Sequence, residues 1–271
     1  MQAKKEIRAG RLYIQTTYSA GMLPGLRPAA RRERQKVQSE ARRKINAVQR
    51  QYHLVQLFEV NFKAGRDLFL ELSFASEPDD KAERDAIRKF HRKMKAYYKS
   101  RGREYRYISV RETHNRDGQP VRVHYHLVCT GTGQRMFDVI RRCWDAGSVD
   151  VRTLRDAFGG FEDTCRYLLK ERKEKGKKAF VTSRNLKKPE EPLRRKIREA
   201  EAGEVPAGVT VIKADVNGSN PYGKYSIIVG KITDLEAFDR YWTRAKLDCR
   251  RWQESQTWKR YARQKRKMAK N

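Results

Sequence analysis

Acidic residues are scarce in this sequence relative to basic ones. The 33 Asp and Glu residues face 63 Lys and Arg residues, which leaves a formal net charge of +30. An excess of this size is more than solubility requires and indicates a polyanionic partner, with nucleic acid as the first expectation. An anionic membrane is the weaker alternative, because no segment pairs a basic face with a clean apolar face.

Long apolar runs and closely spaced cysteines are also missing. No apolar stretch approaches the roughly 20 residues needed to cross a bilayer, and the basic start of the chain lacks the apolar core of a secretory signal. The four cysteines are widely spaced without a CxxC pair, which argues against a zinc ribbon or a disulfide framework. We therefore expect an intracellular protein, whose hydrophobic content of 38% can build a core.

Histidine is rare as well, with five in 271 residues, yet two of them stand two positions apart at His124 and His126. The surrounding segment, Val121–Val128, is rich in β-branched and aromatic residues and lies between glycine-containing turns, which predicts a strand. Side chains alternate along a strand, so both imidazoles project from one face and can share one cation. The spacing can also arise by chance in a chain of this length.

A second predicted strand, Tyr105–Thr113, precedes a turn at Asn115–Gly118, so the two strands should form an antiparallel hairpin. With even-numbered residues opposite even-numbered ones, Glu112 lies across from His124 or one diagonal step away. Its carboxylate then completes a His-His-Glu metal site. The alternative is a solvent-facing Glu112 at the strand end, which a register slip of one residue would produce.

Tyr167 and Lys170 lie three positions apart in a predicted helix, Phe161–Glu174, and therefore share one flank of it. In the simpler interpretation, Tyr167 is a half-buried aromatic residue at the edge of the core. A basic connector, Gly176–Pro189, follows this helix. It carries three candidates for phosphate contacts, which can equally form a solvated loop: Arg184, Lys187 and Lys188.

The remaining pattern predicts an α+β fold, in which helices pack on an antiparallel β-sheet and basic helical extensions precede and follow it. One strand, Leu68–Phe74, is nearly continuous in apolar residues, as in a central strand covered on both faces. Further strands are expected at Arg11–Thr17, Ser148–Val151, Val209–Val216 and Lys224–Ile232. Further helices are expected at Ala30–His53, Ser76–Gly102, Met136–Ala146, Glu190–Ala202 and Leu235–Lys270.

These elements divide the chain into four parts. A basic arm and helix (residues 1–53) precede the core (residues 54–189). A charged helix and a β-hairpin accessory to the core (residues 190–232) come next, and a long basic helix or tail (residues 233–271) ends the sequence.

Taken in order, the motifs resemble the HUH endonucleases of rolling-circle replication, particularly the initiator proteins of small bacterial phages and plasmids. The resemblance covers about residues 61–189 and includes the connector, which looks like the segment after the tyrosine helix in phage-type initiators. The motifs that carry it are the apolar strand Leu68–Phe74, the pair His124-Tyr125-His126 with Glu112 on the preceding strand, and Tyr167-Leu168-Leu169-Lys170.

The resemblance implies an RRM-like core and a site-specific nickase and strand transferase that forms a 5′-phosphotyrosine with single-stranded DNA. Tyr167 is then the single nucleophile and Lys170 assists it, while Glu112, His124 and His126 hold Mg²⁺ or Mn²⁺. The implied partners are origin DNA and the helicase and polymerase of a bacterial host, in whose cytoplasm the protein acts. No membrane partner is expected.

Two other functions stay open. In conjugative relaxases of this superfamily the nucleophilic tyrosine precedes the histidine pair, so a mobilisation relaxase would use Tyr13 or Tyr18. A non-catalytic nucleic-acid-binding protein would need only the positive charge, and the paired histidines would be packing residues.

Overall fold

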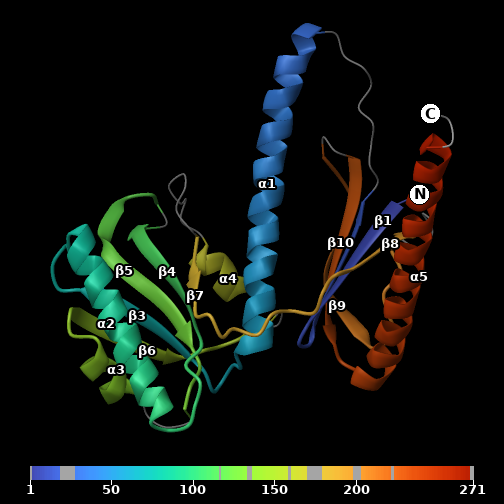
Figure 1. The fold of residues 1–271 in the computed structure, drawn as a ribbon. Coiled ribbons are helices and arrows are strands. Elements are labelled where there is room, and N and C mark those ends of the chain that lie inside the picture. The colour runs from blue at the N-terminus through green and yellow to red at the C-terminus, as the bar shows by residue number, and fades with distance from the viewer. Residues whose placement is uncertain are drawn as a thin grey trace. The chain divides into compact units, whose positions relative to one another are not determined.

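The computed structural model has an α+β fold, which confirms the predicted class. Its described residues are 2–18, 28–115, 117–132, 136–157, 160–169, 179–197, 203–220 and 223–268. Within these ranges the strands form two antiparallel five-stranded sheets (Figure 1). The chain divides into two compact units, unit 1 (Met1–Gln49 and Pro189–Asn271) and unit 2 (Arg50–Lys188). The four-part division drawn from the sequence stays a prediction.

The sheet of unit 2 has the strand order β6-β3-β5-β4-β7. The strands are β3 (Leu68–Phe74), β4 (Tyr107–His114), β5 (Pro120–Cys129), β6 (Gly147–Thr153) and β7 (Val181–Thr182). Strands β4 and β5 form the predicted hairpin. Its turn is closed by the Asn115 side chain, which accepts hydrogen bonds from the N–H groups of Asp117 and Gln119. Gly118 follows with φ of 78°, a conformation that favours glycine.

Helices α2 (Asp80–Lys99) and α3 (Phe137–Cys143) cover one face of this sheet (Figure 1). Asp79 caps α2, because its side chain accepts hydrogen bonds from the N–H groups of Lys81 and Ala82 in the first turn. The apolar residues between helices and sheet form one core, whose main members are Leu70, Leu72, Phe74, Phe90, Met94, Ile140 and Trp144. This core leaves the other face of the sheet available for polar groups.

Strand β3 does not have two apolar faces, contrary to what its composition predicted. Leu70, Leu72 and Phe74 are buried in the core, whereas the alternate residues are only partly buried on the opposite face. Those alternate residues are Phe69, Glu71 and Ser73. The prediction failed because an aromatic ring on a functional surface is indistinguishable in sequence from one in a core.

The opposite face is met by α4 (Glu162–Leu168) and by the last turns of α1 (Pro28–Asn61). Phe161, directly before α4, packs against Phe58 of α1 with ring centroids 5.6 Å apart. Helix α1 continues past the predicted end at His53. The second half of the helix predicted over Phe161–Glu174 lies outside the described residues.

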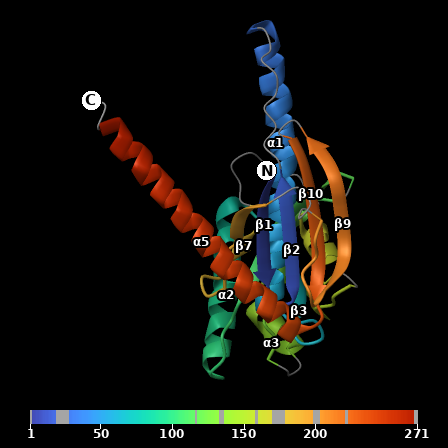
Figure 2. The ribbon, with the colours of Figure 1, turned by 90° about the vertical axis from the view of Figure 1, so that its right-hand side faces the viewer.

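The sheet of unit 1 has the strand order β8-β1-β2-β10-β9 (Figure 2). The strands are β1 (Gln2–Ala9), β2 (Leu12–Tyr18), β8 (Leu193–Ile197), β9 (Val209–Asn220) and β10 (Gly223–Ile232). Helix α5 (Leu235–Met268) packs on this sheet, and Tyr13, Ile232, Phe238 and Trp242 are buried between them. No helix in the described ranges is both long and apolar enough to cross a membrane.

The helix predicted over Glu190–Ala202 was wrong. Leu193–Ile197 forms β8 instead and pairs antiparallel with β1, which the sequence had also not predicted. The predicted hairpin of β9 and β10 belongs to this second sheet, since β10 pairs with β2. A charged segment of this kind takes the strand conformation because its partner strand, far away in the sequence, supplies the hydrogen bonds.

Strand β1 escaped prediction because it buries charged side chains. Lys4 and Glu6 are 3% and 0% exposed, and Lys4 Nζ lies 3.3 Å from Glu6 Oε1. The same carboxylate accepts hydrogen bonds from the hydroxyls of Tyr13 and Tyr241. The α5 side of β1 is therefore polar, and the usual alternation of apolar and polar residues is absent.

Candidate metal centre and active site

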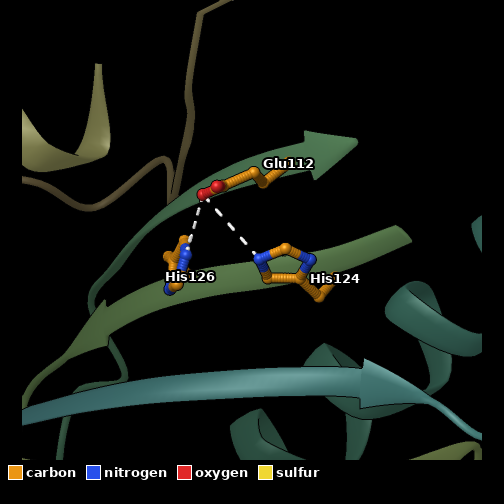
Figure 3. Close-up of side chains that lie close together, drawn as sticks. All are labelled: Glu112, His124 and His126. Carbon is orange, nitrogen blue, oxygen red and sulfur yellow. Dashed lines mark ion pairs between the residues drawn. The ribbon is translucent and has the colours of Figure 1, made fainter. Parts of the chain in front are cut away.

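Glu112, His124 and His126 converge on the face of the unit 2 sheet that α2 does not cover (Figure 3). In the β4–β5 register Glu112 lies directly opposite His124, as predicted, so the carboxylate shares a face with both imidazoles. One ligand atom from each residue lies within 4.8 Å of the others. Three donors on two adjacent strands can thus bind one ion.

The distances within this cluster are short and its members are largely buried. Glu112 Oε2 lies 2.8 Å from His126 Nε2 and 3.7 Å from His124 Nε2. Glu112 is 4% exposed and His126 is 2% exposed. Among the described residues, neither ring nitrogen of His126 makes an aligned hydrogen bond. A buried imidazole without such bonds is costly, and a cation at Nε2 would remove that cost.

The tautomer of His124 also suits a metal ligand. Its Nδ1 lies 3.0 Å from the carbonyl oxygen of Arg122. A carbonyl only accepts hydrogen bonds, so Nδ1 carries the proton and, in the neutral ring, Nε2 presents a lone pair toward Glu112. Fixing the distal nitrogen through a backbone carbonyl is the usual way in which proteins orient a metal-binding imidazole.

The register of the hairpin is held from the core side by Glu83 of α2. Its carboxylate pairs with the Arg111 guanidinium through two contacts, Nε–Oε1 at 2.6 Å and NH2–Oε2 at 2.9 Å. It also accepts a hydrogen bond from the Tyr125 hydroxyl. Burial raises the pKa of Tyr125, and the neighbouring carboxylate adds to this effect. One residue of each strand is thus tied to α2, next to the cluster on the other face.

Helix α4 brings Tyr167 to the cluster. The centroid of its ring lies 5.3 Å from that of His126 and 6.5 Å from that of Phe69. The sequence had placed Tyr167 on a helix but contained no sign of which strand the helix would meet. Lys170 lies outside the described residues, so its position relative to the hydroxyl stays a prediction.

The three basic candidates of the connector are exposed and held near the same sheet. Arg184, Lys187 and Lys188 all face solvent. Strand β7 pairs with β4, and the side chain of Asn61 donates to the carbonyl and accepts from the N–H of Lys187, each at 2.8 Å. The connector therefore presents its positive charge from a fixed backbone.

The donor set of the cluster fits a divalent cation. Two imidazole nitrogens with a carboxylate oxygen are compatible with a site that keeps water in its other positions, as magnesium and manganese sites do. Such a site beside a tyrosine, on a strongly basic protein, is suited to chemistry on a phosphodiester. A comparison of the chain with known families bears on this.

Residues 67–173 match a family model described as replication-associated protein ORF2. The matched replication-associated segment runs from the start of β3 past α4. It thus includes the whole Glu112, His124 and His126 cluster and Tyr167. The match supports a role in DNA replication for a protein whose charge already indicated nucleic acid. Searches of curated proteins and of solved structures found no match.

Sequence reasoning missed Glu71 and Phe69, which adjoin the cluster within the replication-associated segment. Glu71 lies directly opposite His126 in the β3–β5 register, with Oε2 4.0 Å from His126 Nδ1. The Phe69 ring centroid lies 5.6 Å from that of His126. Both alternate with the core residues of β3, so strict two-residue periodicity would have identified them.

Proposed function

We propose that this protein is a site-specific endonuclease that nicks and rejoins single-stranded DNA to initiate rolling-circle replication. The observation that carries the proposal is the approach of the Tyr167 ring to His126, one of three residues able to hold a cation. The replication-associated match supports the biological setting. The products are a 5′-phosphotyrosine and a free 3′-hydroxyl, which a host polymerase extends while a host helicase exposes more template.

The reaction is an in-line displacement at phosphorus. The Tyr167 oxygen forms a bond to phosphorus as it loses its proton, and the bond to the 3′ oxygen breaks as that oxygen gains one. Mg²⁺ or Mn²⁺ held by Glu112, His124 and His126 would neutralise a nonbridging oxygen of the phosphate. Lys170, one helical turn after Tyr167 in the sequence, would offset the developing charge. Reversal of the step rejoins the strand.

The DNA strand would be held by charge at the edge of the same sheet. Arg184, Lys187 and Lys188 are exposed on a connector that is anchored to α1 and β4. Lysine and arginine contacts to phosphates give affinity that falls steeply with salt. These residues are proposed to position the strand, and not to read its sequence.

A covalent adduct assay tests the proposal. Labelled single-stranded DNA of the cognate genome is incubated with the protein and manganese, and adducts that survive SDS are counted. Tyr167→Phe should abolish them, and Tyr97→Phe on α2 is the matched control that should not. His124→Ala should reduce them by about a hundredfold or more, as should a chelator. An adduct that persists in Tyr167→Phe would assign the nucleophile elsewhere.

The two alternatives make different predictions. A relaxase using Tyr13 is disfavoured, because that hydroxyl is buried and donates to Glu6 and Gln15, and burial together with the Glu6 carboxylate raises its pKa. Tyr18 is 44% exposed, so Tyr18→Phe is the informative variant for this alternative. A non-catalytic binding protein would show no covalent product and DNA binding that a chelator leaves unchanged.

A further inference from the structure

A groove of about 620 Å³ opens directly beside the cluster, within unit 2. Its walls come from β3, from the end of β6 with the residues after it, and from α4. The residues that matter for its chemistry are Phe69, Glu71, Arg152, Arg155, Asp163 and Tyr167. Its volume falls within the range of about 300 to 1,000 Å³ typical of small-ligand sites, which suits one nucleotide and excludes a duplex.

We infer that this groove receives one unpaired nucleotide, next to the phosphate that Tyr167 attacks, and selects its base. The inference rests on the proposed function and adds a determinant of sequence specificity to it. The nucleotide is identified by three features of the groove: an aromatic surface, cationic groups at the rim and carboxylates inside.

The aromatic surface is Phe69. Its ring is partly buried and lies near two other rings, 5.6 Å from that of His126 and 6.5 Å from that of Tyr167 by centroid. A ring held in this way on a strand has little conformational freedom to lose when a base stacks on it. A base on Phe69 would place its own phosphate close to the cluster.

The cationic groups are Arg152 and Arg155, both exposed. Arg152 is the cross-strand neighbour of Phe69 in the β3–β6 register, so it lies at the edge of the stacking surface. Guanidinium groups at this rim are placed to bind the phosphates on either side of a base seated in the groove. They supply affinity for any sequence.

The carboxylates are Glu71 and Asp163. Asp163 stands four residues before Tyr167 on α4, which places both on one face of the helix. Arg166 donates a hydrogen bond to Asp163 Oδ1 and so orients the carboxylate. A carboxylate repels phosphate but accepts hydrogen bonds from the amino groups of adenine, cytosine and guanine. Thymine has no amino group and presents two carbonyl oxygens, so the groove should discriminate against it.

The test is a binding selection that does not require cleavage. Protein carrying Tyr167→Phe is equilibrated with single-stranded oligonucleotides that have a fully randomised core, and the bound strands are sequenced. We expect one position at which thymine is depleted about tenfold. Adding Asp163→Asn should abolish this preference while the overall affinity stays within about threefold. The matched control is Asp85→Asn, on the exposed surface of α2, which should leave the preference unchanged.

A second variant separates base selection from charge. Arg155→Gln should weaken binding to all sequences and reduce the salt dependence, without changing the preferred base. An unselective parent protein, or an Asp163→Asn protein with the parent's preference, would overturn the inference. The proposed function fails separately, through the absence of an adduct with wild-type protein, because the selection is read in a protein that lacks the nucleophile.

Discussion

Mild acid is expected to destabilise unit 2 through His91 of α2. The ring stacks on Tyr107 with centroids 3.9 Å apart, and its Nδ1 lies 3.1 Å from the hydroxyl oxygen of Tyr105. Burial lowers the pKa of His91 from 6.5 to about 4, because the imidazolium loses its hydration in this site.

The folded pKa lies below the unfolded one, so protons bind the unfolded chain first. Above about pH 6.5 His91 is neutral in both states and contributes nothing; stability is lost as the pH falls from there to about 4 and no further below it. The two pKa values differ by an amount equivalent to at most about 3 kcal/mol of unfolding free energy. About 1.4 kcal/mol of this is lost by about pH 5.5.

Hydrogen exchange of the β4 and β5 amides, read by mass spectrometry, isolates unit 2 from unit 1. The opening free energy is compared between about pH 7.5 and about pH 5.5 for the wild type and for the double variant His91→Phe, Tyr105→Phe. The variant keeps a stacked ring and removes both polar partners. It should lose about 1.4 kcal/mol less than the wild type over this interval. An equal loss in the two proteins would refute the reasoning.

Two further substitutions test how the cluster and the connector are supported. Glu83→Gln replaces the two-contact ion pair with Arg111 by a neutral hydrogen bond, so urea unfolding of unit 2 should show a loss of about 1 to 2 kcal/mol; a change within about 0.5 kcal/mol would place this pair with ordinary surface pairs. Asn61→Ala removes both hydrogen bonds to the Lys187 backbone, so residues 183–188 should exchange faster and single-stranded DNA should bind more weakly at the same net charge. Unchanged exchange there would mean that β7 alone holds the connector.

The local parts of the candidate site were predictable from the sequence. The hairpin follows from turn chemistry at Asn115 and Gly118, and its register places Glu112 opposite His124 without information from the rest of the chain. The approach of Tyr167 depends on how α4 packs over the sheet, which no local pattern encodes. Phe69 was misread for a related reason, since burial of an aromatic ring is decided by what packs against it.

The second sheet was harder to predict because its interior is partly ionic. Sequence periodicity detects strands through an apolar face, and β1 presents Lys4 and Glu6 to α5 instead. Its pairing with β8 joins residues far apart in the chain, for example Gln2 with Ile197. Contacts of that sequence separation leave no mark on the local composition of either segment.

Unit 2 is an insertion in the sequence of unit 1, and this fixes an order of events during synthesis. The ribosome completes residues 50–188, with the cluster and Tyr167, before it makes β8 or β10, the later partners of β1 and β2. Until then the early hairpin of β1 and β2 has two unpaired edges, which invite association with other nascent chains. The charges of Lys4, Lys5 and Arg8 on that hairpin are suited to keeping those edges apart while the chain is unfinished.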